Sequence, residues 1–187
     1  MKHSIVRQTI VETASHLFYQ NGYNLTGINE IIKEAGIAKA TLYNHFKSKN
    51  DICLAYLDYK DKVFTESIQS FIDELPKGEA QILGLFDFLT SFFQDENFNG
   101  CWCINTVSEI PNENEAVKSK IKKQKSELIT FINELTTNAF ENKTVKENKT
   151  LAKQVYLLYE SAVSESFLHQ SEWPIIEAKS LCKKIIA

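Results

Sequence analysis

The sequence predicts an all-α protein of about nine helices. Its 187 residues include only 3 prolines and 6 glycines, so few positions interrupt a helix. Between these breakers, apolar side chains recur every three to four positions, which is the spacing of one helix face. A hydrophobic content of 43% suits a globular protein, and no apolar run reaches the length that spans a bilayer.

The first three helices follow one another within the first fifty residues. The first is expected over residues 4–21. The second follows Thr26, which stands at its N-cap position, and ends at Gly36, where a left-handed residue is expected. The third is expected over residues 38–46. Two short helices joined by a tight turn have the layout of a helix-turn-helix, whose second helix enters the DNA major groove. The inner face of the first helix carries Ile10, Ala14, Leu17 and Phe18.

The outward side of the third helix offers hydrogen-bond donors and no acidic group. Leu42 and Phe46 are four positions apart and are expected to face the core. The polar side chains left on the other sides are Lys39, Thr41, Tyr43, Asn44 and His45. A solvated face normally mixes charges, whereas donors alone suit phosphate oxygens and base edges. One alternative stays open, a polar three-helix corner that binds no nucleic acid.

This segment resembles the DNA-binding domain of the TetR family of bacterial transcriptional regulators. The matching residues are Ile10, Val11, Ala14, Leu17, Phe18, Gly22, Tyr23, Thr26, Ile28, Ile31, Ala35, Gly36, Ile37, Lys39, Thr41, Leu42, Tyr43, His45, Phe46 and Lys49. The resemblance implies a helix-turn-helix DNA-binding domain over residues 1–48. A helical ligand-binding and dimerisation domain is expected over residues 49–187.

The resemblance also implies a role for individual side chains on double-stranded DNA. Base-edge contacts are expected from Lys39, Thr41 and Asn44. Phosphate contacts are expected from Thr26, Tyr43, His45 and Lys49. Ala40 lies on the same helix, where the family frequently has glycine, so the operator sequence cannot be carried over. The expected function is a ligand-responsive regulator that binds a palindromic operator as a homodimer, with repression the usual outcome.

The distribution of charge agrees with a DNA-binding head. The chain carries a net charge of −3, yet residues 1–50 hold six lysines and arginines against three glutamates. The first fifty residues are therefore positive and the remainder negative, which orients the molecule toward the phosphate backbone. The N-terminus enters an amphipathic helix without a secretory signal, so a cytoplasmic location is expected.

Six further helices are expected in the rest of the chain. They cover residues 49–75, 79–94, 101–109, 113–140, 150–170 and 174–186, with a loop at 141–149. The helix at 150–170 has Leu157, Ser161, Ser164 and Phe167 off its core stripe, as in a helix covered by a partner on its second side. In the family the last two helices of each subunit form the dimer interface, so a homodimer through residues 150–186 is expected. The alternative is a thick monomer core.

A small-molecule effector is expected in the second domain. Its candidate lining residues are Phe86, Phe92, Phe93, Phe98, Trp102, Tyr156 and Tyr159, with Asn105 as a polar anchor. Apolar walls with few polar groups favour an apolar or aromatic compound. Aromatic residues at helical spacing are also typical of simple core packing, and that alternative stays open.

No enzyme, cofactor or metal site is expected. A phosphate-binding glycine loop, a nucleophile elbow and a His-Glu metal motif are all missing from the sequence. Cys101 and Cys103 would point about 200° apart on a helix, so one metal ion cannot easily bind both. Two alternatives remain: a thiol-responsive regulator that uses this pair, and a helical interaction protein without DNA binding.

Overall fold

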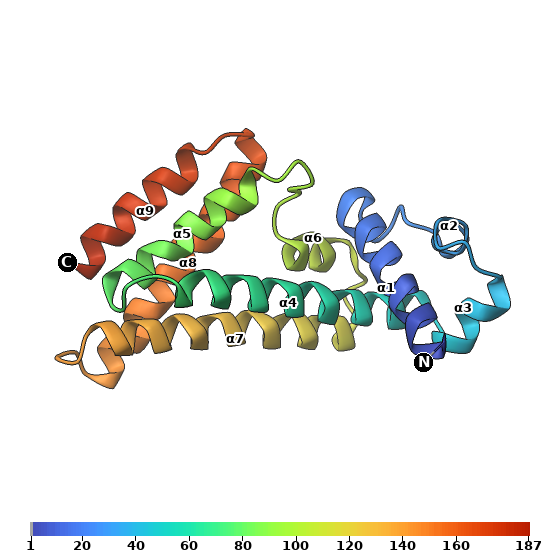
Figure 1. Ribbon diagram of the computed structural model, residues 1–187, viewed down its shortest axis with the longest axis horizontal. Coiled ribbons are helices and arrows are strands. Elements are labelled where there is room, and N and C mark those ends of the chain that lie inside the picture. The colour runs from blue at the N-terminus through green and yellow to red at the C-terminus, as the bar shows by residue number, and fades with distance from the viewer. Residues whose placement is uncertain (1) are drawn as a thin grey trace. The chain divides into compact units, whose positions relative to one another are not determined.

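The computed structural model describes residues 2–187, and the side chains from residue 5 onward. Within that range the chain forms nine helices and no strand. Figure 1 labels each helix along the ribbon. The helices are α1 (Lys2–Asn21), α2 (Ile28–Glu34), α3 (Lys39–His45), α4 (Lys49–Asp73), α5 (Glu79–Phe93), α6 (Trp102–Glu109), α7 (Glu115–Ala139), α8 (Val145–His169) and α9 (Trp173–Ile186). The prediction of an all-α fold with an N-terminal helix-turn-helix is confirmed.

The helices group into two compact units. The head contains the residues up to Phe64 together with Trp102–Lys122, and the body contains Thr65–Cys101 together with Lys123–Ala187. Two long helices, α4 and α7, therefore contribute residues to both units. The helix α6 belongs to the head, although its sequence position lies far beyond the boundary expected at residue 48.

The core of the head is built by the apolar stripes of α1 to α4. The inner face predicted for α1 is buried, and α2 packs against both α1 and α3. The Phe18 ring lies 5.5 Å from the ring centroids of both Tyr23 and Tyr56, which joins α1 to α4. The buried side chains include Ile10, Ala14, Phe18, Ile31, Leu42, Ile52, Tyr56 and Leu57.

The N-terminus of α2 differs from the prediction. Its N-cap residue is Gly27, and Glu30 accepts a hydrogen bond from the Gly27 N–H at 3.2 Å. The Thr26 side chain is fully buried, and its hydroxyl donates to the carbonyls of Leu17 and Gly22 at 3.2 and 2.8 Å. The expectation that Thr26 caps α2 is wrong, because its hydroxyl donates to one carbonyl of α1 and to that of Gly22, the residue that follows α1.

The core of the body is formed by α5, α8 and α9. The helices α8 and α9 pack along each other, and α5 packs against both (Figure 1). Asp87 on α5 forms an ion pair with Lys179 on α9 at the edge of this contact. The buried side chains include Ile82, Leu85, Phe86, Leu89, Leu151, Val155, Tyr159, Ala162 and Ile175.

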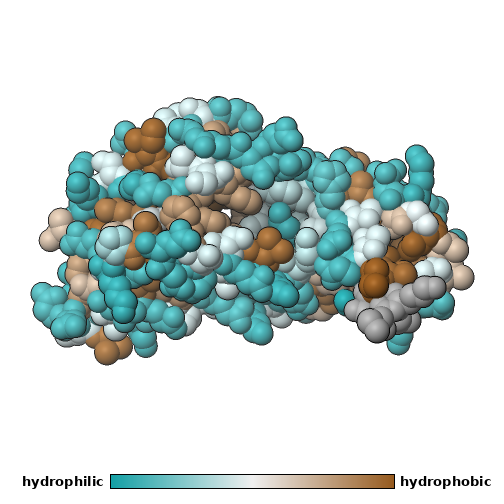
Figure 2. Space-filling view, in the orientation of Figure 1, coloured by the Kyte–Doolittle hydropathy of each residue, from teal (hydrophilic) through white to brown (hydrophobic). Residues whose placement is uncertain are grey.

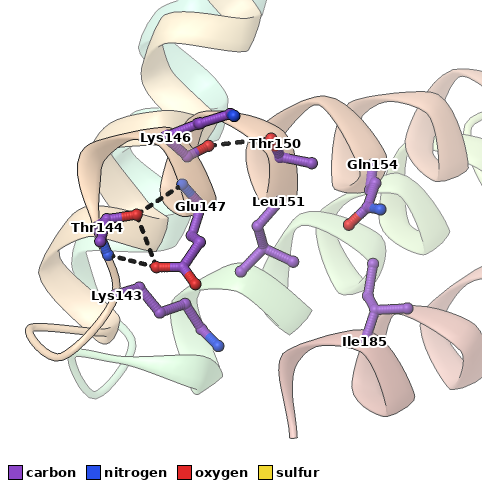
Figure 3. Close-up of a pocket in the computed structure, with 8 residues that line it drawn as sticks. All are labelled: Lys143, Thr144, Lys146, Glu147, Thr150, Leu151, Gln154 and Ile185. Atoms are coloured by element: carbon purple, nitrogen blue, oxygen red, sulfur yellow. Dashed lines mark hydrogen bonds between the residues drawn. The ribbon is translucent and has the colours of Figure 1, made fainter.

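The helix α8 begins earlier than expected, at Val145 within the predicted loop. The Thr144 hydroxyl accepts a hydrogen bond from the Glu147 N–H at 3.3 Å, and the Glu147 carboxylate accepts one from the Thr144 N–H at 2.7 Å (Figure 3). This reciprocal pair is a capping box, which fixes the start of a helix in a polar segment. The polar composition of residues 141–149 concealed that signal.

On the face drawn in Figure 2, hydrophilic side chains predominate and apolar ones form small separate patches. Across residues 2–187, the structure contains no helix with both the length and the apolar character needed to traverse a membrane.

Candidate nucleic-acid interface

The helix α3 is held to the head by two apolar side chains. Leu42 is fully buried and Phe46 is 4% exposed, as their four-residue spacing predicts. Phe46 also ends the helix in an extended conformation, and the Arg7 guanidinium lies 4.9 Å from the centre of its ring. These anchors fix which side of α3 faces outward.

The outward side of α3 carries the predicted donors. Lys39, Ala40, Tyr43 and Asn44 are exposed, and Tyr43 exposes 44% of its surface. Thr41 and His45 are half-buried. Ammonium, hydroxyl and amide groups thus share a short helix without a carboxylate. This set can donate to phosphate oxygens and to acceptors on base edges.

The turn between α2 and α3 has the hydrogen bonds of a Schellman motif. The Gly36 N–H donates to the Lys33 carbonyl at 3.1 Å, and the Ile37 N–H donates to the Ile32 carbonyl at 3.2 Å. Gly36 has φ +63, a left-handed conformation that glycine adopts without steric cost. The position predicted for this residue is therefore confirmed, and the turn sets the direction in which α3 leaves α2.

Lys49 is the first residue of α4, the helix that follows α3 in the chain. Ser48 caps α4 by accepting the Asp51 N–H at 3.1 Å, so the predicted position of Lys49 at a helix N-terminus is confirmed. Its ammonium lies 4.3 Å from the centre of the Tyr23 ring. Burial lowers the pKa of Lys49, whereas Cys53 and the Glu109 carboxylate oppose that shift. Tyr23 and Glu109 were not among the predicted site residues, since nothing in their spacing links them to Lys49.

Thr26 is the one predicted DNA contact that the structure turns inward. Its hydroxyl has no exposed surface and donates to two carbonyls of the head. A phosphate outside the protein cannot reach it, so the expected phosphate contact of this side chain is wrong.

The segment from α1 to α4 is similar to a family of known proteins. Residues 10–56 match the family model of bacterial regulatory proteins of the TetR family. The protein belongs to the TetR family. Its relatives are helix-turn-helix transcriptional regulators, and the prediction of a DNA-binding transcriptional regulator is confirmed.

Similarity to TetR-family proteins extends beyond the head. The chain is 28% identical to the transcriptional regulator YxaF of Bacillus subtilis, over 91% of this chain and 89% of the relative. It is 25% identical to the transcriptional repressor NemR of Escherichia coli, over 97% and 94% of the two chains. The crystal structure of a TetR-family transcriptional regulator from Streptomyces coelicolor shares its fold, with a TM-score of 0.88, 23% identity and coverage of 98% and 95%.

The predicted ligand residues of this TetR-family protein fall into both units. Trp102 and Asn105 lie on α6 and belong to the head. In the body, the Phe98 ring contacts the rings of Phe92 and Phe93, with centroids 5.5 and 5.4 Å apart. Phe167 of α8 joins them at 6.3 Å from Phe98. The sequence placed Phe167 off the core stripe of its helix but gave no reason to add it to this cluster.

Two of the other predicted aromatic residues of the body are buried in its core. Phe86 and Tyr159 are buried and meet edge to face at 6.1 Å, whereas Tyr156 is half-buried. None of the predicted ligand residues borders the pocket of about 500 Å³ between the start of α8 and the end of α9 (Figure 3). Its lining residues are Lys143, Thr144, Lys146, Glu147, Thr150, Leu151, Gln154 and Ile185.

All four cysteines are buried, and Cys101 has a charged neighbour that the sequence did not indicate. The Lys125 ammonium lies 3.1 Å from the Cys101 sulfur and 2.7 Å from both oxygens of Glu160. Burial raises the pKa of Cys53 and that of Cys182 to about 12. In the described part of the chain, no three His, Cys, Asp or Glu side chains gather where they could hold a metal ion.

Proposed function

We propose that the protein is a homodimeric repressor that binds a near-palindromic operator and is released by a small apolar or aromatic compound. The observation that carries the DNA-binding part is the outward side of α3, which offers hydrogen-bond donors and no carboxylate and is fixed by buried Leu42 and Phe46. Dimers of this kind place two such helices in successive major-groove faces, about 34–36 Å apart. A regulator of this kind acts on the bacterial chromosome, in the cytoplasm.

The donors divide by chemistry into two groups. We assign Lys39, Thr41 and Asn44 of α3 to base edges. An asparagine can bind adenine through two hydrogen bonds, which discriminates against other bases by about 1–3 kcal/mol. We assign Tyr43, His45 and Lys49 to phosphates, with Ala40 allowing close approach of the helix. The DNA-binding domain is taken as residues 1–48.

The dimer interface is assigned to α8 and α9, within residues 150–186. Large apolar side chains remain exposed on both helices. Leu157 and Leu168 on α8 are 64% and 71% exposed, and Ile176 on α9 is 59% exposed. Ser161 and Ser164, between the two leucines, are also exposed and small. A second copy of this chain would cover this surface, which isolated α8 and α9 leave in water.

The effector site is assigned to the ligand-binding and dimerisation domain, residues 49–187. The aromatic cluster of Phe92, Phe93 and Phe98 is only half-buried, so its rings are not fully used by the core. Such rings suit an apolar or aromatic compound. The relative NemR is named a repressor, which supports repression as the outcome.

The DNA-binding roles are tested by comparing Asn44→Ala with Lys49→Ala. Each variant is titrated against a labelled duplex from the region upstream of its own gene, at several salt concentrations. Lys49→Ala should weaken binding to every duplex and reduce the salt slope by about one unit. Asn44→Ala should leave the slope unchanged and relax preference at one base pair. Identical behaviour of the two variants would refute the assignment.

A thiol-responsive regulator is the second candidate, and the contact between Lys125 and Cys101 is the observation that favours it. It ranks lower because Cys101 and Cys103 are both buried. Under this hypothesis mild peroxide abolishes DNA binding and a reductant restores it. The response should disappear in Cys101→Ser or Cys103→Ser, and a full response in both variants would exclude the pair.

A further inference from the structure

Glu109, the last residue of α6, forms two hydrogen bonds with the turn between α1 and α2. Its carboxylate accepts a hydrogen bond from the Asn24 N–H at 2.7 Å. Its carbonyl accepts a second from the Asn24 side-chain amide at 2.9 Å. The two residues are 85 positions apart in the sequence. A helix outside the helix-turn-helix segment thus holds the turn from which α2 begins.

The Glu109 carboxylate also approaches Gly22 closely. This residue has φ +87, and a Cβ atom there would lie 2.4 Å from one Glu109 carboxylate oxygen. A larger residue at position 22 would force the Glu109 carboxylate to shift from the position in which it accepts the Asn24 N–H. The absence of a side chain at residue 22 therefore leaves room for the Glu109 carboxylate beside the turn.

The same turn supports Lys49. Tyr23 lies between Gly22 and Asn24, and its ring lies 4.3 Å from the Lys49 ammonium. The Glu109 carboxylate favours the charged form of Lys49, whose pKa burial lowers. The Lys49 ammonium therefore lies against the ring of Tyr23, and the carboxylate that binds the next turn residue favours its charge.

We propose that Glu109 is a positioning residue for DNA binding, which holds Lys49 in place for a phosphate by fixing the α1–α2 turn and by its own charge. The proposal rests on the proposed function of Lys49 as a phosphate contact. A lysine held in one arrangement loses less side-chain freedom on binding than a mobile one. Glu109 itself touches no DNA in this mechanism.

The test is a double-mutant cycle between Glu109→Ala and Lys49→Ala in the full-length protein. Binding to the same upstream duplex is measured by fluorescence anisotropy at several salt concentrations. Glu109→Ala should weaken binding about three- to tenfold, because the lysine must then be ordered on binding. In the Lys49→Ala background the same substitution should have almost no effect. A purely structural role would instead give the same loss in both backgrounds.

Two further variants distinguish the loss of the hydrogen bonds between Glu109 and Asn24 from a general loss of folding. Glu109→Gln keeps an oxygen acceptor for the Asn24 N–H but removes the charge, so it should fall between the wild type and Glu109→Ala. Glu113→Ala removes an exposed carboxylate four residues later in the sequence and should bind like the wild type. Thermal unfolding of each variant shows whether it is folded at the assay temperature.

The outcomes distinguish this proposal from the proposed function. If Lys49→Ala binds DNA as the wild type does, the phosphate role of Lys49 fails. If Lys49→Ala weakens binding while Glu109→Ala and Glu109→Gln do not, only the positioning role of Glu109 fails. Equal losses from Glu109→Ala in both backgrounds would also overturn it.

Discussion

The Lys125 ammonium on α7 lies 2.7 Å from both carboxylate oxygens of Glu160 on α8, and the two side chains are only 17% and 16% exposed. Such a pair is taken largely out of water, so each charge depends on the other for compensation. Lys125→Met should therefore lower the free energy of unfolding by about 3–5 kcal/mol, as measured by urea denaturation.

The neighbouring pair of Lys123 and Glu127 provides a matched control. Its atoms are 3.6 Å apart, and its side chains are 76% and 56% exposed. Lys123→Met should change the free energy of unfolding by less than about 1 kcal/mol. A double variant, Lys125→Met with Glu160→Met, should recover most of the loss, because no unpaired charge remains buried. Similar effects of Lys123→Met and Lys125→Met would contradict this account.

The sequence predicted the head well because its signals are local. The spacing of Leu42 and Phe46 and the glycine at position 36 are signals that involve only a few neighbouring residues. Both apolar side chains are buried, and Gly36 is left-handed, as predicted. Thr26 shows the limit of such signals, because a residue before a helix can cap that helix or bond to the one before it. Only the packing of α1 decides between these choices.

The side-chain contacts between different helices were less predictable, because they join positions that are distant in the sequence. Lys125 and Glu160 are 35 positions apart, and Glu109 and Asn24 are 85 apart. One sequence carries no signal that pairs such residues, since helical periodicity identifies a buried face and not its partner. The same reasoning explains why Phe167 was not predicted beside Phe98.

The capping box of α8 should contribute measurably to the stability of the body. Thr144→Ala removes the acceptor of the Glu147 N–H and should lower the free energy of unfolding by about 0.5–2 kcal/mol. Thr150→Ala is the control, since that exposed hydroxyl only donates to the Lys146 carbonyl within the helix. Urea denaturation of both variants tests the assignment, and an equal change in the two would place the start of α8 elsewhere.

Alkaline pH should destabilise the folded protein. Burial raises the pKa of Cys53 and Cys182 from 9.0 to about 12. Above pH 9 the unfolded chain therefore releases two protons that the folded chain retains, so the free energy of unfolding falls as pH rises toward 12. The loss is about 1.4 kcal/mol per pH unit for each cysteine within that window. Burial also raises the pKa of Tyr56 and Tyr159, which adds to the effect from about pH 10.

The measurement is urea denaturation at pH 8 and pH 10 with a reductant present and the protein concentration fixed. Cys182→Ala should show a smaller difference between the two pH values than the wild type, by about 1 kcal/mol. Its absolute stability is not the readout, because the smaller side chain also leaves a cavity. An unchanged pH dependence would mean that this thiol ionises in the folded protein as it does in the unfolded chain.

Three glycines of the head form a graded series that separates backbone strain from crowding. Gly27 has φ −89 and open space around it, so Gly27→Ala should change the free energy of unfolding by less than about 1 kcal/mol. Gly36 has φ +63 and also has open space, so Gly36→Ala should cost about 1–2 kcal/mol from backbone strain alone. Gly22 combines φ +87 with the Glu109 carboxylate 2.4 Å from the added methyl group.

Gly22→Ala should therefore be the most destabilising of the three. It adds to the backbone strain the loss of the hydrogen bond from the Asn24 N–H to a charged acceptor, which is worth about 1.5–3 kcal/mol when it is protected from water and less at this exposed site. Hydrogen exchange at the Asn24 amide separates the two contributions, since only the displacement of Glu109 should accelerate it. If Gly22→Ala and Gly36→Ala are equally destabilising and the Asn24 amide stays protected, then the carboxylate moves aside without releasing the turn.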